Sequence, residues 1–152
     1  MFVKPDILHL CGEPGELNTS RVKILRDRLQ SNDMEIPIMQ AISVEDMSAV
    51  EFAKEYEDVS DYFILDTSTS LVKGVGASGK VHDWNVSKAI VDSVKIPVVL
   101  AGGLSPENVR EAIERVKPWG VDSLTHTNKT LDDGNFVKDI TKVREFFINA
   151  TR

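Results

Sequence analysis

The sequence predicts an α/β fold of five parallel βα units, because short apolar runs alternate with longer amphipathic segments along its 152 residues. Such alternation is typical of a parallel sheet with right-handed crossovers. A complete (βα)₈ barrel needs roughly 200–250 residues, so this chain is too short for one. Two architectures are considered: an incomplete, TIM-barrel-like set of units, which we favour, and an open doubly wound sheet, as in flavodoxin-like proteins. We expect residues 1–152 to form a single truncated barrel-like domain.

The N-terminal half contains three of the expected units. Their strands are apolar runs bounded by polar residues or glycine, at residues 6–11, 36–42 and 62–65. The first helix, over residues 16–31, has leucine and isoleucine at near-helical spacing. Ser43 is the expected cap of the next helix, which runs to about residue 58, and Asp46 stands where a capping box has Glu or Gln.

The C-terminal half begins with a glycine-rich loop over residues 67–83, and loops of this length tend to be functional or mobile. Asp83 is the expected N-cap of the helix that follows it. Ser105 as an N-cap, with Pro106 in the first helical position, is a strong helix start. The elements expected here are strands over 96–100 and 120–125 and helices over 84–94, 105–117 and 138–149.

The composition excludes several classes of function. A net charge of -6 and a pI of about 5.1 argue against nucleic acid as a partner, because its phosphates require clustered Lys and Arg. The single cysteine, Cys11, excludes an internal disulfide, and we expect it to be a small buried residue. We see neither a membrane-spanning apolar stretch nor a signal peptide, and therefore expect a soluble cytoplasmic protein with no membrane partner.

Residues that could bind a ligand or take part in catalysis lie at the ends of the expected strands, where ligands bind in both architectures. Gly102 and Gly103 suit an anion, because glycines let backbone N–H groups approach a phosphate and a helix N-terminus follows. A tight βα turn is an equally good interpretation of this pair. Asp66 ends an apolar strand, and burial favours the protonated form of a carboxyl group that acts as a general acid. The alternative is a carboxylate that caps the following loop.

Five further polar residues are candidates for a site or for ordinary surface positions. Lys80 either pairs with a substrate anion or extends into solvent. Asp122 lies within the last expected strand and Thr125 at its mouth, and we take both, with Lys80, as candidates for binding a substrate or its phosphate. His82 and His126 have no spacing partner that indicates a metal site, so we expect loop or surface residues and no metal.

Four motifs follow one another along the chain. Residues 63–67 read Phe-Ile-Leu-Asp-Thr, and residues 76–84 read Gly-Ala-Ser-Gly-Lys-Val-His-Asp-Trp. Residues 99–109 read Val-Leu-Ala-Gly-Gly-Leu-Ser-Pro-Glu-Asn-Val, and residues 117–122 read Lys-Pro-Trp-Gly-Val-Asp. In this order they resemble the phosphoribosylanthranilate isomerases, and the resemblance covers nearly the whole chain. It implies the part of a (βα)₈ barrel from about strand four to strand eight.

This resemblance implies an Amadori rearrangement in tryptophan biosynthesis, which converts the aminoaldose N-(5-phosphoribosyl)anthranilate into an aminoketose without a cofactor or metal. The family's acid, which protonates the ribose ring oxygen, matches Asp66. Its phosphate-binding turn matches Gly102 and Gly103, and the aspartate of its last strand matches Asp122.

The sequence also departs from the family pattern. The family's base cysteine lies in a Lys-Ile-Cys-Gly motif on its first strand, which has no counterpart here, and Cys11 takes the place of a fourth-strand histidine. His82 replaces a phenylalanine. The chain is therefore either an isomerase of this family or a non-catalytic relative that binds a sugar phosphate or a partner chain. Five parallel strands leave two sheet edges open, so we expect a homo-oligomer or a complementing N-terminal fragment.

Overall fold

Five parallel strands form the central sheet of the protein, in the order in which they occur along the chain. The computed structural model describes residues 5–12, 16–69, 72–75 and 82–152. The strands are β1 (Leu8–Leu10), β2 (Ile38–Ser43), β3 (Tyr62–Asp66), β6 (Val98–Leu100) and β7 (Gly120–Val121). Because neighbouring strands of this sheet are all parallel, the five carboxyl ends meet at the same edge of the sheet.

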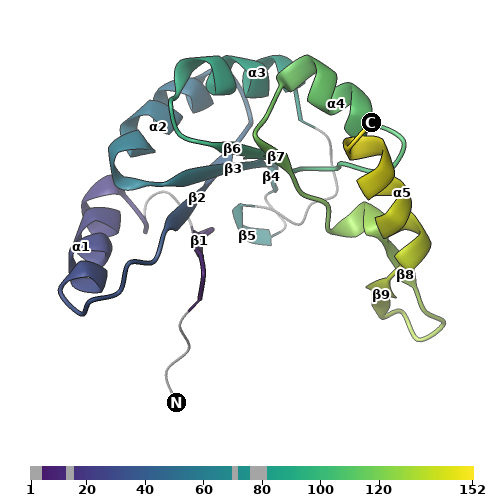
Figure 1. Cartoon of the computed structure of the whole chain (residues 1–152), viewed down its shortest axis with the longest axis horizontal. Coiled ribbons are helices and arrows are strands. Elements are labelled where there is room, and N and C mark those ends of the chain that lie inside the picture. The colour runs from purple at the N-terminus through teal and green to yellow at the C-terminus, as the bar shows by residue number, and fades with distance from the viewer. Residues whose placement is uncertain (1–4, 13–15, 70–71, 76–81) are drawn as a thin grey trace.

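The helices lie along the outer, convex side of this curved sheet (Figure 1). They are α1 (Thr19–Gln30), α2 (Ser48–Tyr56), α3 (Trp84–Ser93), α4 (Val109–Val116) and α5 (Ile140–Ala150). Right-handed crossovers between strands in sequential order place every helix on the same face. The incomplete TIM-barrel-like arrangement is thus confirmed. The doubly wound alternative is wrong, since it requires the strand order to reverse and helices to cover both faces.

The core follows from the two-residue period of the strands, whose side chains alternate between the two faces. The larger cluster lies between sheet and helices and includes Ile38, Ile42, Phe63, Leu65 and Leu100, all fully buried. The intervening strand residues form a smaller cluster on the concave face, made of Ala41, Ile64, Val99 and Ala101 with Met39 beside it. Both faces of the central strands are apolar, which explains their nearly continuous hydrophobic sequences.

Several short elements occur besides the five predicted strands and helices. A hairpin of β4 (Ser68–Thr69) and β5 (Val72–Val75) follows β3 and lies on the concave side of the sheet (Figure 1). Short 3₁₀ helices occupy η1 (Glu57–Val59) and η2 (Thr125–Thr127), and a second hairpin joins β8 (Asn128–Thr130) to β9 (Phe136–Lys138).

The last strand is shorter than predicted. It ends at Val121, so the placement of Asp122 and Thr125 in a strand over residues 120–125 was wrong. The ladder with β6 contains only two residue pairs, because β6 turns away at Gly102 and Gly103. The N–H of Asp122, just after β7, donates a further hydrogen bond to the carbonyl of Leu100 in β6 (2.9 Å).

The predicted helix starts were partly correct. Asp83 caps α3 through its carboxylate, which accepts the N–H of Asn85 at 2.9 Å. Ser43 does not cap α2, because it is the last residue of β2; Asp46 Oδ1 instead accepts the N–H of Ser48 at 2.7 Å. The Ser105 hydroxyl does accept the N–H of Glu107 (3.2 Å) as an N-cap would, although the regular helix begins only at Val109.

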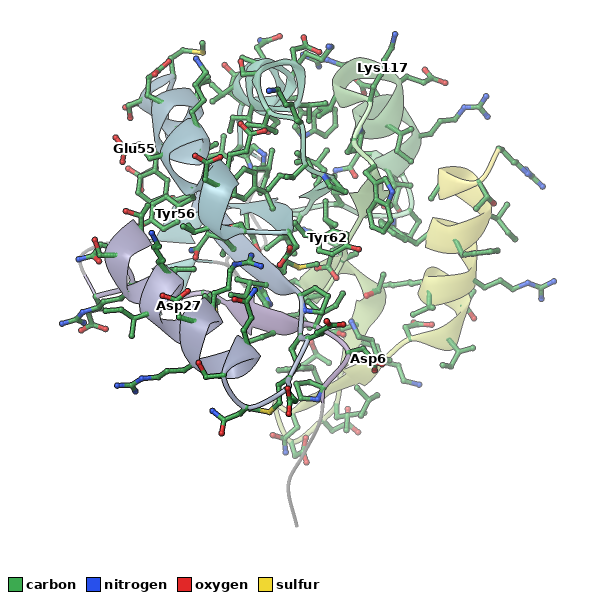
Figure 2. The ribbon with its side chains drawn as sticks, turned by 60° about the vertical axis from the view of Figure 1, so that its left-hand side comes forward. Asp6, Asp27, Glu55, Tyr56, Tyr62 and Lys117 are labelled. Atoms are coloured by element: carbon green, nitrogen blue, oxygen red, sulfur yellow. The ribbon has the colours of Figure 1, made fainter. Side chains whose placement is uncertain are left out.

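Tyr56 ties the first two helices together. It lies on α2 and faces α1 (Figure 2), and its hydroxyl donates to the carbonyl of Leu17 at 2.8 Å. Burial raises the pKa of this phenol, so the hydroxyl stays a donor at neutral pH.

Asp61 should stabilise the start of β3 measurably. Its carboxylate accepts bonds from Arg26 Nη2 (2.8 Å) and from the N–H of Ile38 (2.7 Å). Asp61→Ala removes both bonds and leaves the N–H of Ile38 without this acceptor, whereas Arg26 Nη2 keeps the carbonyl of Val59 at 3.0 Å. We expect urea unfolding to show a loss of about 1–2 kcal/mol. The exposed pair of Lys54 and Glu51 is the control, since Glu51→Ala should change stability by less than about 0.5 kcal/mol. Equal effects of the two variants would contradict this account.

Candidate functional site

A pocket opens where β3, β6 and β7 end. It is lined by Asp66, Gly102, Gly103, Leu104, Asp122, Ser123, Leu124, Thr125 and His126. Asp66, the glycine pair, Asp122 and Thr125 were predicted to converge, and the parallel strands do bring them to one place. Lys80, the remaining candidate, lies outside the described residues.

The turn after β6 depends on its two glycines. Both have positive φ, 77° for Gly102 and 69° for Gly103, a region that side chains other than glycine rarely adopt. Within the described part of the chain, no acceptor takes a hydrogen bond from the N–H groups of Gly102, Gly103 or Leu104. Three successive amides that lack an acceptor and line a pocket ahead of a helix are suited to bind an anion.

Asn108 braces this turn from the side of α4. Its Oδ1 accepts the N–H of Ser105 at 2.8 Å, and its Nδ2 donates to the carbonyl of Gly103 at 3.1 Å. The side-chain amide therefore satisfies one donor and one acceptor of the loop and fixes its shape. Asn108 was not predicted as part of the site, although Asn three positions after Ser105 is a recognisable loop-bracing pattern.

Asn108→Asp should weaken anion binding more than it weakens the fold. The carboxylate still accepts from Ser105, but it loses the bond to Gly103 and brings negative charge next to the turn. We expect inorganic phosphate to bind about tenfold more weakly, which corresponds to about 1.4 kcal/mol. Isothermal titration of the variant and the parent protein measures this. An unchanged affinity would argue against an anion site at this turn.

Asp66 is half-buried at the end of β3 and faces the same pocket. One carboxylate oxygen accepts the N–H of Thr67 at 2.6 Å, and its backbone carbonyl accepts the N–H of Val44 at 3.0 Å. The bond to Thr67 is the loop-capping contact that the sequence allowed as an alternative. Because the side chain also lines the pocket, capping and acid chemistry are compatible for this residue.

The far wall of the pocket is held by bonds from the region after β7. The Ser123 hydroxyl donates to the carbonyl of Leu104 at 2.6 Å, which joins this wall to the glycine turn. Lys138 Nζ donates to the carbonyl of Leu124 and to Thr127 Oγ1, both at 2.8 Å. Thr125 sits in η2 between these anchors and lines the pocket there.

His82 lies in the loop before α3, as one of the two expected positions allowed, but it is buried, so the expectation of a surface position was wrong. Its Nδ1 lies 3.2 Å from Thr67 Oγ1 and its Nε2 lies 2.7 Å from Ser87 Oγ. Burial lowers the pKa of the ring to about 4 and outweighs the opposing effect of the nearby Asp83 carboxylate. The useful signal in the sequence was that His82 replaces a phenylalanine of the related motif, a residue type expected in the interior.

The buried neutral ring of His82 should make stability fall with acid. The unfolded chain takes up a proton near pH 6.5 and the folded chain only near pH 4, so the loss occurs as the pH falls between these values. We expect the free energy of unfolding, measured with urea, to fall by about 1–3 kcal/mol across this range. Above pH 7 the His82 ring should cause no change with pH. His82→Phe should have a flatter profile. Identical profiles for both proteins would show that the ring does not carry the effect.

Cys11 is exposed, which contradicts the expected burial. It follows β1, the first strand in the order of the sheet, where no second neighbouring strand is found in the described part of the chain. Among the described residues, no group of three or more His, Cys, Asp and Glu is placed to hold a metal ion. No helix in the same part of the chain is long and apolar enough to cross a membrane.

Comparison with known proteins identifies relatives of this chain. Residues 25–149 match the family described as N-(5'-phosphoribosyl)anthranilate (PRA) isomerase. The N-(5'-phosphoribosyl)anthranilate isomerase of Methanocella arvoryzae is 40% identical over 123 residues, which are 79% of this chain and 54% of that protein. N-(5'-phosphoribosyl)anthranilate isomerase 2 of Methanosarcina mazei is 45% identical over 115 residues, covering 76% and 49% of the two chains.

A solved structure of phosphoribosyl anthranilate isomerase shares the fold. It superposes with a TM-score of 0.67 and 25% identity over 96% of this chain and 59% of that one. That crystal structure contains reduced 1-(o-carboxyphenylamino)-1-deoxyribulose 5-phosphate. The present chain spans about half the length of the relatives it matches.

Proposed function

The chain belongs to the N-(5'-phosphoribosyl)anthranilate isomerase family, and from this premise we propose that it contributes the acid and the phosphate-binding turn to an isomerase of tryptophan biosynthesis. The substrate is the aminoaldose N-(5-phosphoribosyl)anthranilate, and the reaction is its Amadori rearrangement. The expected cytoplasmic location is part of this proposal.

The observation that carries the proposal is the shared pocket of Asp66 and the Gly102–Gly103 turn. The N–H groups of the turn suit a 5-phosphate, and the start of α4 behind them adds a favourable dipole. A ribose fixed through its phosphate can then present its ring oxygen to Asp66, which supplies the proton that opens the ring. Asp122 and Thr125 complete the wall on the opposite side.

The proposal includes a partner that covers the open edges of the sheet. Within the described residues, β1 and β7 each pair with a single strand. Beside β7, an apolar groove is lined by Trp119, Val121, Val143, Phe146 and Phe147. Three of these side chains are exposed, Trp119 at 68%, Phe147 at 65% and Val143 at 39%. We propose that N-terminal βα units, or a second copy of the chain, pack there and complete the substrate site.

One observation favours a second candidate, a chain that binds sugar phosphates without isomerising them. Among the described residues, those that line the pocket come from the end of β3 and from residues 102–126. Phosphate binding can therefore precede, or occur without, assembly of a complete barrel.

Reconstitution tests these alternatives. The chain is assayed for isomerisation of N-(5-phosphoribosyl)anthranilate alone and mixed with a separate polypeptide carrying the first three βα units of the Methanocella arvoryzae relative. Titration with the reduced product analogue measures binding in both samples. Turnover in either sample supports the isomerase, and binding without turnover supports the second candidate. Absence of both would refute the proposed site.

A further inference from the structure

A buried histidine lies behind the pocket rather than in it. The ring of His82 joins two hydroxyl groups from different elements, Thr67 at the end of β3 and Ser87 in α3, at 3.2 and 2.7 Å. Ser87 is fully buried, so the ring is anchored from the helix layer. Thr67 is the residue whose N–H binds the Asp66 carboxylate.

The same ring lies against the glycine turn. A Cβ at position 102 would stand 2.7 Å from His82 Nδ1 and 3.0 Å from both His82 Cε1 and Thr67 Oγ1. The imidazole and the hydroxyl thus fill the space in which a side chain of residue 102 would lie. One ring therefore contacts the strand end that carries Asp66 and the turn that carries the free amides.

We propose that His82 is a positioning residue that holds the phosphate-binding turn and the Asp66 strand end in one fixed arrangement. This inference rests on the proposed function, because it assigns His82 to the same sugar-phosphate site. His82 is not among the residues that line the pocket, so it acts through Thr67 and Gly102.

The chemistry of the contacts explains why a histidine suits this place. A neutral imidazole offers one donor and one acceptor, and each hydroxyl partner can take the complementary role. Thr67 and Ser87 are therefore both satisfied whichever nitrogen carries the proton. The lowered pKa keeps the ring neutral, so its contribution is position rather than charge. Phenylalanine would preserve the ring's bulk but leave the buried Ser87 hydroxyl and the half-buried Thr67 hydroxyl without this partner.

Two variants and a double variant test the coupling, with inorganic phosphate as the probe. His82→Phe and Thr67→Val each remove the bond between the two residues, and we expect each to weaken phosphate binding about tenfold, or about 1.4 kcal/mol. The double variant should bind no more weakly than either single one, because both remove the same interaction. Ser93→Ala is the matched control: its hydroxyl bonds within α3 on the exposed side, and phosphate affinity should not change.

Backbone order parameters measured without ligand separate this inference from the proposed function. In His82→Phe, the values at Gly102 and Gly103 should fall from about 0.85 to below about 0.6, while that at Leu100 stays high. If the parent protein binds no phosphate but this local loss of order appears, the proposed function fails and the positioning role stands. The positioning role is overturned if the turn stays ordered in His82→Phe. It is also overturned if the parent protein binds phosphate and His82→Phe binds it with the same affinity. Thr67→Val, which removes the same bond and keeps the His82 ring in place, is the substitute for both measurements where the Phe variant does not fold.

Discussion

Replacing Asp66 by asparagine should lower turnover of the reconstituted isomerase by about 10²–10⁴-fold, the range for loss of a general acid. The amide has nearly the same shape as the carboxylate. Its oxygen can still accept the N–H of Thr67, which donates to the Asp66 carboxylate at 2.6 Å in the parent protein. The strand end therefore keeps its structure while the transferable proton is lost. Steady-state kinetics should show the loss in kcat, with binding of the reduced product analogue changed by less than about threefold.

The matched control for this variant is Asp92→Asn. Asp92 is an exposed carboxylate on α3 that forms an ion pair with Lys88 on the same helix, so turnover should be unaffected. An Asp66→Asn protein with normal kcat would remove Asp66 from the proposed chemistry. A protein that lost analogue binding and turnover in equal measure would make Asp66 a binding residue instead of the acid.

Gly102→Ala should destabilise the protein by about 2–4 kcal/mol and abolish measurable phosphate binding. The new Cβ meets His82 Nδ1 at 2.7 Å, and the φ of 77° is itself unfavourable for alanine by about 1–2 kcal/mol. The turn must move to relieve this contact, which displaces the amides that we assign to the phosphate. Urea unfolding and phosphate titration measure the two effects separately.

Gly134 provides the control for Gly102, since its φ is also positive, at 83°, but a Cβ there would meet nothing within 4 Å. Gly134→Ala should therefore lose only the stability that alanine costs at positive φ, about 1–2 kcal/mol, and phosphate affinity should not change. Similar losses of stability and of phosphate affinity in both variants would show that the contact with His82 has no special role.

The fold was predictable from the sequence because its strands and helices differ in period and in composition. The run from Phe63 to Leu65 and the run from Val98 to Leu100 are apolar on both faces, as buried parallel strands require. The choice between a barrel-like and a doubly wound sheet was not predictable in this way. Strand order depends on which strand each crossover returns to, and periodicity carries no information about that.

The site was predictable only as far as it lies at strand ends. Asp66 and the glycine pair follow from the rule that ligands bind at the carboxyl ends of parallel strands. The buried position of His82 was missed, because its burial arises from contacts with Thr67 and Ser87 that lie 15 and 5 residues away. Thr125 was assigned to a strand, but the ladder of β7 stops before it. The reason is tertiary, since β6 turns at Gly102, and the sequence of residues 120–125 does not show this.

The most direct test of the account is a crystal structure of the chain, alone or reconstituted, with the reduced product analogue. We expect the phosphate to lie within hydrogen-bond distance of the N–H groups of Gly102, Gly103 and Leu104, and the sugar to lie beside Asp66. An analogue bound elsewhere on the protein, or a phosphate at this turn with the sugar directed away from Asp66, would contradict the shared site.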